Sequence, residues 1–138
     1  MPAWQATCVA IDGRGLLIEG PPGAGKSSLA LALIDRGAVL VGDDSLMLKR
    51  RGGRLYARPH PKTRGLLEVR NLGLIDYPVC EEAPLALALL LSEQAPRFPE
   101  EIESAEWLGV SLPQVKLWPN SPVLHLRAEL ALQRFGLG

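Results

Sequence analysis

The chain has 138 residues, enough for one compact domain with its own core. Lys plus Arg and Asp plus Glu number 15 each, so there is no net positive field to hold a nucleic-acid backbone or an anionic membrane. The N-terminus shows no signal-peptide pattern, and no window reaches the roughly 18 apolar residues of a membrane span. We therefore expect a single cytoplasmic domain over residues 1–138, with neither nucleic acid nor membrane as a partner.

The first elements predicted along the chain are two strands and a helix. Residues 7–11 and 16–19 are apolar and β-rich, and they flank a turn at residues 12–15. The second strand runs directly into a glycine-rich loop. Good helix formers then fill residues 26–36, and Gly37 stands where helices commonly end. The order strand, loop, helix is that of a nucleotide-binding α/β unit.

Further strands are predicted in the middle of the chain. Residues 38–41 are fully apolar, which favours a buried strand. A hairpin is predicted around residues 51–54, because two extended arms flank a Gly-Gly pair. Residues 66–70 and 72–77 would add two more strands.

Two helices separated by a loop are predicted in the last part of the chain. Pro84 begins "PLALALLLSE", which places Pro at a first helical position and continues with Leu and Ala, so we predict a second helix there. Residues 93–104 are rich in Pro, Glu and Ser and predict a surface loop. In residues 121–135, Leu recurs at helical spacing and predicts a C-terminal helix.

The glycine-rich loop carries a phosphate-binding pattern. Gly20, Gly25, Lys26 and Ser27 match the spacing G-x-x-x-x-G-K-[ST]. In such a loop, backbone N–H groups converge on phosphate oxygens at the positive end of a helix, the lysine adds charge, and the hydroxyl ligates Mg²⁺. The alternative is a structural glycine turn beside a surface lysine. The predicted nucleotide-binding residues are Gly20, Pro21, Pro22, Gly23, Ala24, Gly25, Lys26, Ser27 and Ser28.

Two adjacent acids follow the predicted strand at residues 38–41. Phosphoryl transfer needs groups that hold the metal and accept the proton of the attacking oxygen, and carboxylates serve both purposes. Asp43 and Asp44 stand at a strand end that should open into the ligand crevice. One could accept the proton while the other assists the metal. The alternative is that the pair simply begins a turn.

Read together, "GPPGAGKSSLALALIDRGAVLVGDDSLML" and "GLLEVRNLGLIDYP" resemble the HPr serine kinase/phosphorylase family. The family combines a phosphate loop, a double aspartate after the next strand, and a Glu-x-Arg-Gly-x-Gly signature. The resemblance runs from about Ala6 to Tyr77, and the chain looks like the short form without the extra N-terminal domain. It implies an α/β phosphate-loop fold similar to that of phosphoenolpyruvate carboxykinase, with a mixed sheet and flanking helices, assembled as a hexamer.

The resemblance also implies an activity. Members of the family use ATP and Mg²⁺ to phosphorylate a serine of HPr, the phosphocarrier of the sugar phosphotransferase system, and they reverse the reaction with inorganic phosphate. By motif match Asp43 is the catalytic acid/base, with Lys26 and Arg70 as further catalytic residues. The metal-side residues would be Ser27, Glu68 and Asp44, and Arg97 would lie in a substrate-side loop.

Three positions depart from the family pattern. Gln5 stands where the family has a His near the catalytic Asp. Unlike His, Gln cannot take up or release a proton at neutral pH, so whether the reverse reaction survives is an open question. Asn71 replaces the first glycine of the signature, and Asn tolerates positive φ better than most residues. Ser28 stands where the family often has an acid.

The residues themselves leave other functions open. One is a phosphate-loop kinase or phosphatase for a different substrate. Another is a nucleotide-binding regulator without catalysis, which Gln5 and Asn71 keep in consideration. A third is a structural module that binds no nucleotide.

Overall fold

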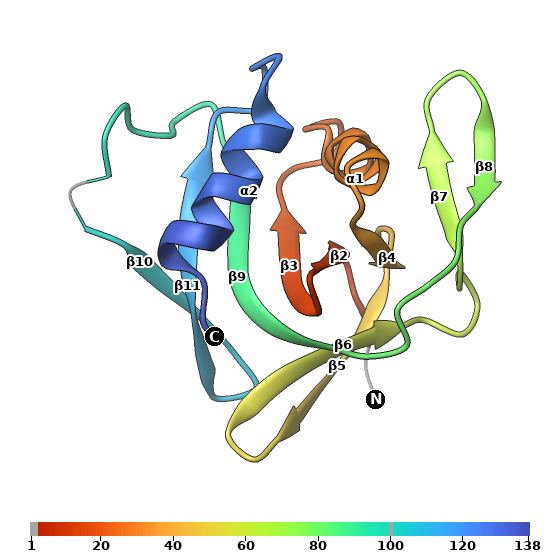
Figure 1. Ribbon diagram of the computed structural model, residues 1–138, viewed down its shortest axis with the longest axis horizontal. Helices are drawn as coiled ribbons and strands as arrows, with labels where there is room; N and C mark the ends of the chain where they lie inside the picture. The colour runs from red at the N-terminus through yellow and green to blue at the C-terminus, as the bar shows by residue number, and fades with distance from the viewer. Residues whose placement is uncertain (1–2, 100) are drawn as a thin grey trace.

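The computed structural model describes residues 3–99 and 101–138, and within them the chain forms two α-helices and eleven β-strands (Figure 1). The strands are β1 (Ala3–Trp4), β2 (Thr7–Ile11), β3 (Arg14–Glu19), β4 (Val39–Gly42), β5 (Leu46–Arg51), β6 (Arg54–Pro59), β7 (Leu66–Val69), β8 (Gly73–Asp76), β9 (Ala83–Leu91), β10 (Glu103–Trp107) and β11 (Val110–Leu117). The helices are α1 (Lys26–Asp35) and α2 (Leu124–Phe135).

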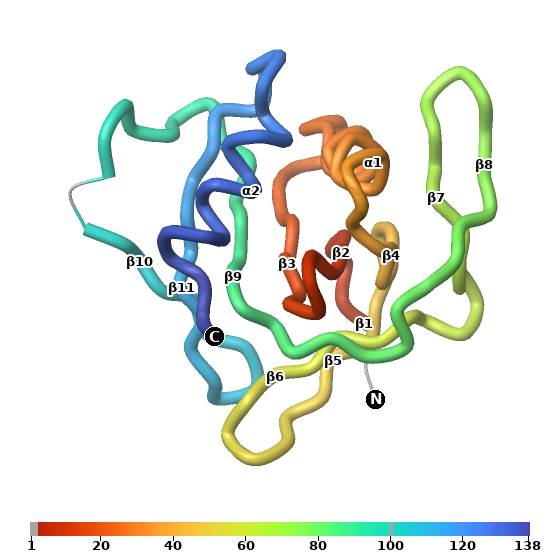
Figure 2. Tube along the Cα trace, in the orientation of Figure 1, coloured from red at the N-terminus to blue at the C-terminus, as the bar shows by residue number. Residues whose placement is uncertain are grey.

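Most strands belong to one curved, mixed sheet. Its main path runs β1-β5-β6-β9-β3-β2-β4. Strand β11 branches from this path by pairing with β9, and β10 pairs with β11. Strand β9 is central because it pairs in parallel with both β3 and β11, while its first residues pair antiparallel with β6. Strands β7 and β8 form a separate two-stranded hairpin beside α1 (Figure 2). Leu67 of β7 is buried in the same apolar cluster as the side chains of α1.

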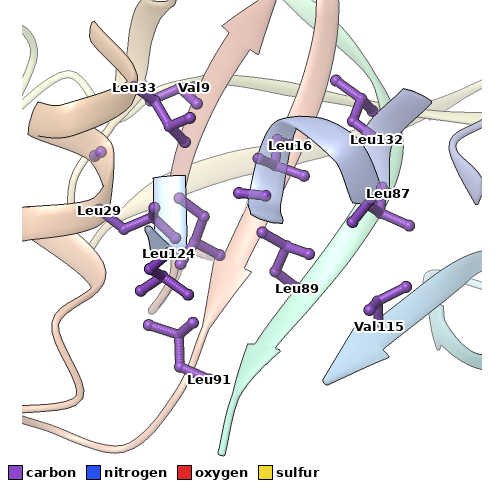
Figure 3. Close-up of a cluster of buried hydrophobic side chains, with 14 of the residues drawn as sticks. Val9, Leu16, Leu29, Leu33, Leu87, Leu89, Leu91, Val115, Leu124 and Leu132 are labelled. Atoms are coloured by element: carbon purple, nitrogen blue, oxygen red, sulfur yellow. The ribbon is translucent and has the colours of Figure 1, made fainter. Parts of the chain in front are cut away.

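Both helices cover one face of the sheet and bury the larger of two apolar clusters (Figure 3). Leu33 of α1 and Leu132 of α2 reach into it beside Leu16 and Leu87 from the strands. The opposite face packs against the β5–β6 hairpin and β10 around a second cluster that includes Leu48, Leu55 and Trp107. The sheet is therefore apolar on both faces.

The fold brings three strand ends to one edge of the sheet. Strands β3 and β4 each pair antiparallel with β2, which lies between them, so they run in the same direction. The phosphate loop follows β3 and Asp43 follows β4, so both lie at this edge. Thr7, the first residue of β2, lies at the same edge because β2 runs the opposite way.

The helix predicted from Pro84 is wrong, because this segment is strand β9. Leu87 and Leu89 pack into the cluster under the helices, while Leu85 and Ala88 pack into the cluster on the other face. A strand covered on both sides needs apolar residues at every position, and such a run lacks the alternation that distinguishes strands from helices. Tertiary burial overrides the helix propensity of Leu and Ala here.

The other predicted elements are confirmed within a residue or three at their ends, namely the strands before and after the loop, α1, β4, the β5–β6 hairpin, β7, β8 and α2. The last two residues of the loop predicted at 93–104 already belong to β10. The β10–β11 hairpin was not predicted. Its turn consists of Leu108 and Gly109, both at positive φ, instead of the usual Asn-Gly signal.

Candidate active site

The phosphate loop lies between β3 and α1 and points its backbone toward open space. Gly23 and Gly25 have φ values of 80° and 100°, a region that favours glycine. Gly25 is the N-cap of α1, and no side chain caps this helix end. The first N–H groups of α1 are thus aligned at its positive end, as an anion site requires.

Lys26 folds back over the loop it belongs to. Its ammonium donates to the carbonyl oxygens of Gly20, at 2.8 Å, and Pro21, at 3.3 Å. These contacts keep the positive charge above the loop, where phosphate oxygens would replace the carbonyls as its partners.

Asp43 is held rigidly behind the loop, with only 7% of its surface exposed. Its Oδ1 accepts hydrogen bonds from the hydroxyl of Ser27, at 2.7 Å, and that of Thr7, at 2.9 Å. Its Oδ2 accepts from the backbone N–H of Glu68 at 3.0 Å. One carboxylate therefore ties the phosphate loop, β2 and β7 together.

Thr7 is the site residue that the sequence analysis missed. Among the described residues, the buried polar side chains are Thr7, with no exposed surface, and Asp43, and they bond to each other. The Thr7 hydroxyl also accepts the N–H of Asp44 at 3.2 Å. The available signal was a polar residue opening the otherwise apolar strand "TCVAI".

Asp44 differs from its neighbour in both conformation and exposure. Its φ of 59° lies in the left-handed region, which turns the chain away from β4 and directs the residue to the surface. Asp44, and not Asp43, lines the cavity in front of the loop. The two acids predicted together therefore occupy distinct environments.

The cavity in front of the loop measures about 640 Å³ and gathers most of the predicted residues. Glu68 and Arg70 both line it, although Arg70 lies in the turn after β7 and not on the strand as predicted. Asn71 has a φ of 74°, so the expectation that Asn supports this turn is confirmed. The lining from the loop and its surroundings comprises Gly20, Pro22, Gly23, Gly25, Lys26, Ser27, Ser28, Asp44 and Gln5.

Arg97 is not brought to this cavity. It is exposed in the connection after β9, with its guanidinium 5.5 Å from the centre of the Phe98 ring. Its predicted substrate-side role stays a prediction.

Glu19 lies at the foot of the loop, as the last residue of β3, and is partly buried. Burial raises the pKa of its carboxyl, and a hydrogen bond with the Gln114 side chain opposes this effect. Burial therefore disfavours the charged form of this carboxyl.

Comparison with known proteins identifies the family. A family model described as the HPr serine kinase C-terminal domain matches residues 2–80, more than half of the chain. The chain belongs to this family. A solved structure, that of the Hpr(Ser) kinase/phosphatase from Coxiella burnetii, is 30% identical and superposes with a TM-score of 0.85, covering 96% of this chain and 95% of that one. The predicted fold class, a phosphate-loop α/β fold with a mixed sheet, is confirmed by this match.

Curated relatives carry the name HPr kinase/phosphorylase. The one from Mycoplasma mycoides is 31% identical over 112 residues, 76% of this chain and 35% of the relative. The one from Clostridium beijerinckii is 50% identical over 68 residues, 49% of this chain and 22% of the relative. The chain thus spans about a third or less of these curated relatives. Among the described residues, no helix is long and apolar enough to cross a membrane.

Proposed function

We propose that the chain is an ATP- and Mg²⁺-dependent protein kinase that phosphorylates a serine of the phosphocarrier HPr. The observation that carries the proposal is the 2.7 Å hydrogen bond from Ser27 of the phosphate loop to the buried carboxylate of Asp43. It places an acid directly against the residue that such loops use to hold the metal. HPr is proposed as the acceptor because the relatives are named as HPr kinases.

The loop and its helix would stabilise the charge of the triphosphate. Residues at the start of α1 line the cavity, and the Lys26 ammonium needs only to leave two carbonyl oxygens to reach a phosphate. Arg70 lines the same cavity and could approach the transferred phosphoryl group. These groups supply positioning and electrostatics, which are most of what phosphoryl transfer requires.

The residues present suit Mg²⁺. Ser27, Asp44 and Glu68 line one cavity and offer oxygen atoms, the donors that Mg²⁺ prefers. Within the described residues no preformed group of three or more acidic, His or Cys side chains could hold a metal by itself. This agrees with the usual Mg²⁺ site of phosphoryl-transfer proteins, in which substrate phosphates and water complete the coordination. The Mg²⁺ ion would neutralise part of the negative charge of the phosphates.

We assign Asp43 as the acid/base that accepts the serine proton. Its Oδ1 accepts hydrogen bonds from Ser27 and Thr7, so the Ser27 hydroxyl must turn away before this oxygen can accept a proton. Asp44 already faces the cavity and is the alternative acid/base. Asp43→Asn and Asp44→Asn separate the two roles, since the residue that only assists the metal should be partly rescued by raised Mg²⁺.

A nucleotide-binding regulator without catalysis is the alternative function. Gln5 lines the cavity at the position of the family's His, and its amide cannot transfer a proton. The same substitution bears on phosphorolysis, because the reverse reaction needs a proton returned to serine. The hexamer implied by the resemblance stays a prediction, which light scattering of the purified chain would test.

The deciding experiment is transfer from γ-labelled ATP with Mg²⁺ to HPr of the same organism. HPr lacking its regulatory serine and the Asp43→Asn enzyme serve as controls. The proposal is supported if wild-type HPr is labelled by the wild-type enzyme and neither control shows label. Adding inorganic phosphate afterwards tests the reverse reaction. Tight ATP binding without transfer would contradict it and favour the regulator.

A further inference from the structure

A second cavity adjoins the phosphate loop and has no role in the function proposed above. It measures about 420 Å³, within the usual range for small-molecule sites. One wall is the loop itself, at Pro21–Ala24, and the other consists of residues 90–93 and 119–120. The two cavities meet at Pro22 and Gly23, which line both.

The position of the reacting groups in the first cavity indicates which part of a nucleotide would lie in the second cavity. The first cavity holds Asp44, Glu68 and Arg70, so the phosphoryl group to be transferred and the incoming hydroxyl belong there. Attacking and leaving oxygens lie roughly in line in such a transfer, so the rest of the nucleotide extends away from the acceptor. A phosphate chain crossing the loop at Pro22 and Gly23 leads into the second cavity.

The walls of the second cavity fit a nucleoside better than a phosphate. Pro21, Leu90, Leu91 and Pro119 provide apolar surface of the kind that packs against a flat base. Glu93 adds a carboxylate, which would repel a phosphate but accepts hydrogen bonds from hydroxyl groups.

Glu93 and Asn120 are already paired across the cavity. The Asn120 amide donates to Oε1 of Glu93 at 3.3 Å. The other side-chain oxygens of this pair, Oε2 of Glu93 and Oδ1 of Asn120, are both acceptors, which suits a ligand with two adjacent hydroxyls such as those of ribose. A carboxylate performs the same task for the ribose of dinucleotides in other α/β folds.

We propose that this second cavity binds the ribonucleoside half of the nucleotide, with Glu93 and Asn120 accepting hydrogen bonds from the ribose hydroxyls. The inference rests on the proposed function in one respect, that the loop binds a triphosphate. It assigns nucleoside recognition to the segment that follows β9 and the turn that precedes α2, neither of which belongs to the phosphate-binding motif.

The test compares three probes that share a triphosphate but differ beyond it. Binding of ATP, 2′,3′-dideoxy-ATP and inorganic tripolyphosphate, each with Mg²⁺, is measured by calorimetry on the full chain. The variants are Glu93→Ala and Asn120→Phe, both at exposed positions, so the fold should tolerate them. Glu106→Ala is the matched control, an exposed acid of β10 outside both cavities. Lys26→Ala removes triphosphate binding.

We expect the wild type to bind ATP about 10- to 150-fold more tightly than dideoxy-ATP, the range for lost hydrogen bonds to a charged acceptor. Glu93→Ala should abolish this preference while tripolyphosphate binding stays equal or tightens, because a negative charge is removed. Asn120→Phe should weaken both ATP and dideoxy-ATP but not tripolyphosphate, Glu106→Ala should change nothing, and Lys26→Ala should weaken all three probes.

Two results would overturn the inference. If ATP, dideoxy-ATP and tripolyphosphate bind equally and the second-cavity variants change none of them, the nucleoside lies elsewhere while the phosphate loop keeps its proposed role. If the wild type binds none of the probes, the proposed function fails and the inference with it.

Discussion

Thr7→Val tests whether the buried hydroxyl organises the site. Valine has nearly the shape of threonine, so the change removes the donor to Asp43 and the acceptor for the Asp44 N–H with little change in volume. A hydrogen bond to a charged acceptor contributes about 1.5–3 kcal/mol, and the N–H left without its acceptor adds about 1 kcal/mol. We therefore expect the free energy of unfolding to fall by about 2.5–4 kcal/mol, a large share of a typical domain's stability.

Urea unfolding followed by circular dichroism measures this loss, and Thr7→Ser is the matched control. Serine keeps the hydroxyl and loses one buried methyl group, at a cost of about 1 kcal/mol. The valine variant should also bind ATP with Mg²⁺ more weakly than the serine variant, because Asp43 and Ser27 lose their fixed alignment. A valine variant as stable as the serine variant, with unchanged ATP binding, would refute the role assigned to Thr7.

Three further predictions concern the surroundings of the site. Gly20→Ala should weaken ATP binding in calorimetry, because a Cβ there would lie 3.2 Å from that of Leu91 and push the loop away; unchanged affinity would contradict this. Burial raises the pKa of Glu19, so the stability due to its protonated form is present at acidic pH and lost as pH rises through that pKa. Glu19→Gln should therefore raise the urea midpoint near pH 7 more than at acidic pH, and parallel pH profiles would refute the assignment. Burial also raises the pKa of the Cys8 thiol, so a thiol reagent should modify Cys80 but not Cys8 until the protein is unfolded, as mass spectrometry would show.

The part of the site that sequence predicted is the part fixed by local chemistry. A phosphate cradle needs glycines at positive φ followed by a helix start, and the structure has this arrangement at Gly23 and Gly25. Asp43 was also predictable, because an acid directly after a buried strand reaches the edge where the loop lies. These features depend on residues close together in the chain.

The parts that escaped prediction depend on contacts between distant segments. Strand β9 looks helical because its strand character comes from neighbours on both faces, which its own residues do not reveal. Thr7 meets Asp43 because β2 lies between β3 and β4, an order known only from the sheet. Arg70 was placed on a strand because the turn after β7 begins one residue earlier than the pattern suggested.

The central strand β9 separates an earlier part of the chain from a later part, and the two parts contribute differently to the site. The loop, Asp43, Glu68 and Arg70 all precede β9, within the stretch that matches the family model. The second cavity takes one wall from the loop and the other from residues that follow, at the end of β9 and before α2. If the later part recognises the nucleoside, as proposed, mutations there change which nucleotide is accepted and leave the proposed transfer residues untouched. We then expect the two parts to diverge at different rates among related sequences.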